Sequence, residues 1–191
     1  MAWLTQTQID ALGFASVGHS VFLSDKAAFY HCEKISLGNH VRIDDFCVLC
    51  AGEGGIEIGN YVHLAVYCEL KGEGKIYMED FSGLSARVSI YSDYSHCRAE
   101  MLAYSDLSES DFFGKKGDVI LHSQSGSGTG SVILPNVTLE MGSGCPTSSV
   151  ITKSCKALGV YFGVPARWVK QRQNHIVELE KQLRAKLARE N

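Results

Sequence analysis

Histidine is the side chain best suited to take up a proton near neutral pH, and the sequence contains seven of them. His96 stands apart because it lies in VSIYSDYSHCRAEM, residues 88–101, where a regular repeat of apolar residues stops. Asp93 lies three residues earlier, close enough to orient an imidazole or a hydroxyl group. The segment from 91 to about 118 is too long for an ordinary turn, and loops of this length are often functional. His96 is therefore a candidate general base.

The other histidines give weaker signals. His63 and His122 lie within the repeat, where each could face a groove or be an ordinary exposed residue. His40 falls near the end of a six-residue unit, where a surface corner is expected. The remaining three lie outside the repeat and are expected at the solvated surface: His19, His31 and His175.

The repeat that surrounds this segment has a period of six. A helix would need a spacing near 3.6 and a half-buried strand a spacing of 2, so six fits neither alone. It fits a coil with three short flat faces, and such coils stack into a parallel β-solenoid. The sequence therefore predicts an all-β solenoid. The large anchors are Leu37, Ile43, Leu49, Ile58, Leu64, Leu70, Ile76, Met78, Leu84, Ile90, Leu121, Ile133, Leu139 and Ile151, with Ser127 and Cys145 at equivalent positions.

Short helices are expected at both ends. Thr5 and Gln8 have the spacing of a capping box, and Gly13 would end the helix that follows. Near the C-terminus apolar residues recur at spacings of three and four, which predicts an amphipathic helix that packs on the solenoid or on a neighbouring subunit. The expected organisation is a lead-in over 1–36, the solenoid over 37–170 and the helix over 171–191. The apolar positions of the C-terminal helix are Ile176, Leu179, Leu183 and Leu187.

Composition excludes several classes of protein. A net charge of -3 gives no global attraction to nucleic acid or anionic lipid. The start MAWLTQTQID does not have the pattern of a secretory signal, and no run of 18 apolar residues is present, so a cytoplasmic protein is expected. The seven cysteines are odd in number and scattered, as expected for reduced thiols. Cys47 and Cys50 form a CxxC, but no second pair stands at zinc-ribbon spacing.

Three stretches carry a resemblance to a known family. They are ISLGNHVRIDDF (35–46), GSVILPNVTLEMGSG (130–144) and SSVITKSCKALGVYFGVPARWVK (148–170). Together they resemble the hexapeptide-repeat acyltransferase superfamily, and most closely the sugar O-acetyltransferases of the polysaccharide, O-antigen, galactoside and maltose types. The resemblance implies a left-handed parallel β-helix and a homotrimer with active sites between subunits. It also implies acetyl-CoA as donor and, as acceptor, a sugar hydroxyl of a surface polysaccharide or its precursor.

The resemblance also implies roles for individual residues. Relatives carry a catalytic histidine in a loop like that of His96, although polysaccharide-type relatives often have glycine there. A histidine base acting in a ternary complex needs no covalent intermediate, and no metal is expected. The residues implied to line the CoA arm or to bind its phosphates are Thr129, Ser148, Thr152, Lys153, Arg167 and Lys170, to which Arg172 could add.

Two coils depart from the family pattern because small residues replace large ones. The segments 123–131 and 143–149 are rich in serine and glycine, which reduces apolar burial by roughly 0.8 kcal/mol per lost CH₂. These coils are expected to be less well packed. A subunit contact or the CoA groove itself would then differ from that of the relatives.

Three other functions stay open. The first is N-acetylation of a nucleotide-linked amino sugar, although no nucleotide-binding motif is visible. The second is a zinc enzyme of the γ-carbonic-anhydrase type, with His63, His96 and His122 as conceivable ligands. The third is a solenoid without catalytic activity.

Overall fold

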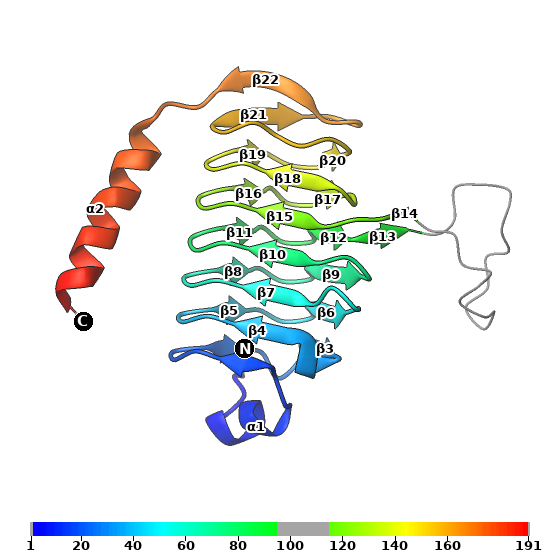
Figure 1. Cartoon of the computed structure of the whole chain (residues 1–191), viewed down its shortest axis with the longest axis vertical. Helices are drawn as coiled ribbons and strands as arrows, with labels where there is room; N and C mark the ends of the chain where they lie inside the picture. The colour runs from blue at the N-terminus through cyan, green and yellow to red at the C-terminus, as the bar shows by residue number, and fades with distance from the viewer. Residues whose placement is uncertain (1, 95–114, 191) are drawn as a thin grey trace, which may run out of the picture.

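The computed structural model describes residues 2–94 and 115–190, which form a parallel β-helix of six stacked coils (Figure 1). Each coil contributes one short strand to each of three parallel sheets. The first sheet contains β1 (Ser16–Val17), β4 (Ile35–Leu37), β7 (Ile56–Ile58), β10 (Ile76–Met78), β15 (Val119–Leu121) and β18 (Val137–Leu139). The third contains β3 (Ala28–Tyr30), β6 (Val48–Ala51), β9 (Glu69–Gly72), β12 (Ser89–Tyr91), β17 (Val132–Ile133) and β20 (Val150–Ile151).

The second sheet is the longest and carries the candidate site described below. After the sixth coil the chain adds an antiparallel hairpin, β21 and β22, to this sheet. Its eight strands are β2 (Phe22–Leu23), β5 (Arg42–Ile43), β8 (His63–Leu64), β11 (Gly83–Leu84), β16 (Gly126–Ser127), β19 (Gly144–Cys145), β21 (Gly159–Phe162) and β22 (Arg167–Gln171).

The predicted anchors form the core, which confirms the solenoid. All fourteen large anchors are at most 3% exposed, and equivalent anchors pair in register from coil to coil, as Leu64 does with Leu84. Small residues fill the inner side of the corners. Cys47 and Cys68 are buried there, and their thiols donate to the carbonyl oxygens of Ala65 and Ser85, each at 3.1 Å. The described cysteines are all free thiols.

The predicted interruption leaves the solenoid between β12 and β15. Its base is a two-stranded antiparallel ladder of β13 (Asp93–Tyr94) and β14 (Lys115–Lys116). The buried Ser92 hydroxyl donates to the Gly74 carbonyl at 2.8 Å, which ties the start of this segment to the coil below. Residues 95–114, which include His96, lie outside the described residues.

The N-terminal segment is more regular than expected. Thr5 caps α1 (Gln6–Ala11) in a full capping box with Gln8, and Gly13 follows with φ of 71°, as predicted. The first coil already begins at β1, upstream of the expected boundary at residue 37. A 3₁₀ turn, η1 (Cys32–Lys34), then leads into the second coil.

The C-terminal helix α2 (His175–Glu190) runs back beside the solenoid toward its N-terminal end (Figure 1). Polar contacts hold it there. The Ser123 hydroxyl donates to Glu180 at 2.7 Å, and Arg184 reaches Asp80 at 3.2 Å. Leu179 and Leu183 of the predicted apolar stripe remain 48% and 39% exposed. Neither helix in the described part of the chain is long and apolar enough to cross a membrane.

Candidate functional site

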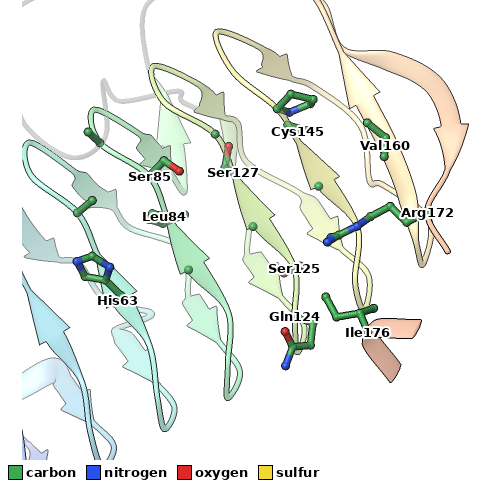
Figure 2. A pocket seen from close by; sticks show the side chains of 17 residues that line it. His63, Leu84, Ser85, Gln124, Ser125, Ser127, Cys145, Val160, Arg172 and Ile176 are labelled. Atoms are coloured by element: carbon green, nitrogen blue, oxygen red, sulfur yellow. The ribbon is translucent and has the colours of Figure 1, made fainter. Parts of the chain in front are cut away.

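A groove of about 770 Å³ runs along the outer face of the second sheet, crossing five successive strands from β8 to β21 (Figure 2). Arg172 and Ile176, which follow the hairpin, line it at the C-terminal end, and His63 lines it at the N-terminal end. Because neighbouring strands lie about 4.8 Å apart, the three spacings from β8 to β19 span about 14 Å. The groove therefore suits a long, narrow ligand that lies parallel to the solenoid axis.

Three stacked glycines form the floor of this groove. Gly83, Gly126 and Gly144 pair in register on β11, β16 and β19, with His63 before them and Val160 after them in the same ladder. None of the three has a positive φ, and a Cβ atom at Gly83 or Gly144 would lie 3.5 Å from the nearest backbone oxygen, an ordinary contact. The backbone thus does not require glycine at positions 83 and 144, whereas a Cβ atom at Gly126 would lie 3.2 Å from the Gly83 carbonyl oxygen, a tight contact. What glycine provides is a bare, flat floor.

This arrangement explains the small residues of the two unusual coils. Gly126, Gly128 and Gly144 of these coils line the groove, whereas Ser143 is buried away from it; Ser125 and Ser127 are largely buried but also border the groove. The hydroxyl oxygens of these three serines have no hydrogen-bond partner among the described residues.

The C-terminal end of the groove carries positive charge. In the hairpin Lys170 pairs with Val160 and Arg167 pairs with Phe162. Paired residues share a face of a sheet, so Lys170 lies on the same face as Val160, which lines the groove, whereas a register shift after Val160 interrupts the regular alternation before Arg167. Arg172 lines the groove directly and donates to the Gly142 carbonyl at 2.8 Å. Such a cluster suits an anionic group, such as a phosphate.

The N-terminal end carries an imidazole fixed by a carboxylate. His63 Nε2 lies 2.8 Å from Asp44 Oδ2, and Arg42 Nε donates to Asp44 Oδ1 at 2.7 Å. The Asp44 side chain is only 7% exposed. Burial raises the pKa of Asp44, but the hydrogen bonds and charges of Arg42 and His63 outweigh it and hold that pKa below its ordinary value. The Arg42 guanidinium also lies 5.4 Å from the centre of the Trp3 ring.

The predicted site residues fall into separate groups. Thr129 and Ser148 are exposed at the corner after the second sheet, beside the groove, where the Ser148 amide donates to the Thr129 carbonyl at 2.8 Å. Thr152 and Lys153 are exposed after β20 of the third sheet and do not line the groove. Asp93 lies in β13, which also follows the third sheet.

The sequence reasoning missed the glycine floor and the pairing of His63 with Asp44. A signal for both was present, because His63, Gly83, Gly126 and Gly144 each directly precede an anchor of the second sheet. His122 is also paired with a carboxylate, Glu79 at 2.8 Å, but it is not among the groove residues. Within the described ranges no three potential metal ligands converge.

Known proteins resemble this chain over nearly its whole length. No protein-family model matches the chain. The chain is 41% identical over 187 residues to the dTDP-4-amino-4,6-dideoxy-D-glucose acyltransferase of Escherichia coli, with 94% of both chains covered.

Solved structures of an acyltransferase also match nearly the whole chain. The N-acyltransferase AntD from Bacillus cereus, crystallised with dTDP and 3-hydroxybutyryl-CoA, superposes with a TM-score of 0.91 at 35% identity. That match covers 97% of this chain and 98% of AntD. A mutant of AntD crystallised with dTDP-4-amino-4,6-dideoxyglucose and coenzyme A has a TM-score of 0.91 at 34% identity, with 96% of this chain and 97% of the mutant chain covered.

A more distant structure shares the fold alone. Galactoside acetyltransferase in complex with coenzyme A has a TM-score of 0.57 at 15% identity, over 89% of this chain and 71% of its own. The near-complete match to the Escherichia coli enzyme and to AntD, joined to the coiled architecture, shows that this chain belongs to the sugar acyltransferases with the left-handed β-helix fold of the hexapeptide-repeat superfamily.

Proposed function

We propose that the protein is an N-acyltransferase that transfers an acyl group from acyl-CoA to the amino group of a dTDP-linked 4-amino-4,6-dideoxy sugar. The observation that carries this proposal is the groove with a glycine floor, cations at one end and a carboxylate-bound imidazole at the other. The relatives with this specificity match nearly the whole chain, which favours N-acylation over the O-acetylation that the sequence first suggested.

The groove supports acyl-CoA as the donor. Its bare floor leaves room for the narrow pantetheine arm, and Arg167, Lys170 and Arg172 would bind the phosphates. Thr129 and Ser148 at the adjoining corner are proposed to contact the arm. With the phosphates at the hairpin, the thioester would lie toward β11 and β8, at the end where His63 stands.

The acceptor would react by direct attack. The amine nitrogen forms a bond to the thioester carbonyl carbon while the C–S bond breaks, and coenzyme A leaves as a thiol after gaining a proton. An amine that attacks must shed one proton, so the reaction needs a proton acceptor beside the thioester. His96 is the acceptor that the resemblance implies, and Asp93, three residues earlier, is a candidate to orient it.

A second subunit is proposed to complete the site, as expected for a homotrimer. The groove lies on the second sheet, whereas Asp93, Thr152 and Lys153 all follow strands of the third sheet. Because these faces are different sides of one solenoid, the two sets of residues would meet when the third-sheet side of one subunit faces the groove of the next.

The test is an acceptor assay with purified full-length protein and acetyl-CoA. We expect thiol release with dTDP-4-amino-4,6-dideoxyglucose, and a product whose mass rises by one acetyl group at an amide. Galactosides and maltose should give at most background release. Turnover of these free sugars without turnover of the dTDP-linked amino sugar would return the function to O-acetylation.

A further inference from the structure

We propose that His63 accepts the proton of the attacking amine and that Asp44 positions it. This inference rests on the proposed function, because it places the thioester at the N-terminal end of the groove. His63 lines that end and directly precedes the glycine floor in the outward ladder of the second sheet. It is half exposed, with 50% of its side chain accessible, so a ligand can reach it.

The hydrogen bonds define which ring nitrogen is available. Asp44 is ionised near neutral pH and can only accept, so the nitrogen that faces it, Nε2, carries the proton. The neutral ring then has its lone pair on Nδ1, which makes no hydrogen bond within the described part of the chain. A second bond from Arg42 fixes Asp44 itself, so the imidazole has one defined orientation.

The proposed step balances in protons and electrons. As the C–N bond forms and the C–S bond breaks, one N–H proton moves to His63 Nδ1 and its electron pair stays on nitrogen. The imidazolium is stabilised by Asp44, which lies 2.8 Å from Nε2. The same proton then passes to the leaving thiolate, which restores neutral His63 and releases coenzyme A as the thiol.

The pair His122–Glu79 offers a matched control. It is also an imidazole–carboxylate pair with a separation of 2.8 Å, here between Nδ1 of His122 and Oε1 of Glu79, and 38% of the His122 side chain is exposed. His122 does not line the groove. A general effect of losing a carboxylate–imidazole pair should therefore appear in both sites, and a catalytic effect only at His63.

The experiment compares His63→Gln, His63→Ala, Asp44→Asn, His96→Ala and His122→Gln in the full-length protein. Turnover is measured with acetyl-CoA and dTDP-4-amino-4,6-dideoxyglucose, and coenzyme A affinity by calorimetry. His63→Gln keeps an N–H donor for Asp44, so a folded variant is expected. We expect kcat to fall about 100-fold or more in both His63 variants, within the usual range for a general base, while the Kd for coenzyme A changes less than about threefold.

Two further readouts separate catalysis from structure. Added imidazole should raise the turnover of His63→Ala in a saturable way, and should not raise that of the wild type. Asp44→Asn should lower kcat with little change in KM, because it acts through the orientation of His63. His122→Gln should retain wild-type kcat.

The outcomes distinguish the two levels of the proposal. If the wild type binds coenzyme A and turns over, but both His63 variants keep kcat within about threefold, the assignment of His63 is overturned while the proposed function stands. A large loss confined to His96→Ala would overturn that assignment in the same way. A kcat loss in His63→Ala that comes with lost coenzyme A affinity and no rescue also overturns it. A wild type that turns over neither acetyl-CoA nor 3-hydroxybutyryl-CoA removes the proposed function, and His63 with it.

Discussion

At the scale of single residues, the groove is open because three successive strand positions carry glycine, which has no side chain. Gly83, Gly126 and Gly144 occupy successive strand positions, and glycine loses more backbone freedom on folding than any other residue; at Gly83 and Gly144 a side chain would meet only ordinary backbone contacts. The fold tolerates this cost at three successive strands of one sheet. Glycines that recur in register on one face despite this cost support the proposed ligand groove.

Gly83→Val should therefore separate stability from binding. Since a Cβ at this position meets only ordinary contacts, we expect unfolding free energy to rise by about 0.5–1 kcal/mol. The same side chain would fill the groove floor, so the Kd for coenzyme A should rise at least about tenfold. Urea denaturation and calorimetry measure the two effects. Ser36→Val, on the outer face of the first sheet, is the control that should leave binding unchanged.

Asp44 gives a second prediction at this scale, on pH. Its pKa is lowered in the folded protein from an ordinary value of 3.8, so its ionisation stabilises the fold above that pH. The contribution is lost as pH falls below 3.8 through the folded-state pKa. Asp44→Asn should destabilise the protein by about 1.5 kcal/mol near neutral pH and by progressively less in acid. Urea unfolding at several pH values measures this, and a difference that grows below the ordinary pKa would contradict it.

At the scale of elements, the coils of the two serine-rich segments differ from the others inside as well as outside. Ser127 occupies the inward position that Leu64 and Leu84 fill in earlier coils. Its hydroxyl has no partner among the described residues, whereas the nearby Ser131 hydroxyl accepts from the Ser149 amide at 3.2 Å. Both serines are buried, but of the two only the Ser131 hydroxyl has a hydrogen-bond partner in the described part of the chain.

Alanine substitutions should distinguish them. Ser127→Ala removes an unpartnered buried hydroxyl, so we expect unfolding free energy to be unchanged or to rise by about 1 kcal/mol. Ser131→Ala leaves the Ser149 amide without this partner and should lower stability by about 1 kcal/mol. The midpoints of urea denaturation of the two variants and the wild type measure these changes in unfolding free energy. Equal losses in both variants would show that Ser127 makes a contact comparable to that of Ser131.

The elements also show what a sequence can reveal. The period of six defined the coils, and the anchors from Leu37 to Ile151 are buried as predicted. The capping box of α1 and the excursion after β12 could also be predicted from the sequence, because both depend on local spacing. The contact between His63 and Asp44 could not be predicted in this way. It joins neighbouring coils, and their alignment depends on which anchors share a sheet.

At the scale of the whole molecule, one chain separates the residues that the proposed reaction must bring together. The groove occupies the second sheet, and the segment that carries Asp93 leaves from the third. If sites form between subunits, each site takes its groove from one chain and its protruding segment from another.

Mixed trimers test this arrangement. Gly83→Val damages the groove and Asp93→Ala the segment, so each homotrimer should be weakly active. Co-expressed chains should regain activity at about a quarter of their sites, those that combine an intact groove with an intact segment. Differently tagged chains allow the mixed species to be isolated and assayed. Activity no higher than the average of the two parents would show that each chain supplies its whole site.

His63, the three glycines, Val160 and Lys170 pair in sequence along the second sheet, so the number of strands between them fixes the distance from the imidazole to Lys170. Each coil adds one strand spacing, about 4.8 Å, between the imidazole and the cations. A solenoid can gain or lose a coil without losing its fold. Here one coil more or less would change the distance between the imidazole and the cations by one strand spacing. Under the proposed function, the number of coils between β8 and β21 would set the length of donor that fits, so we expect this number to be maintained even where individual side chains vary.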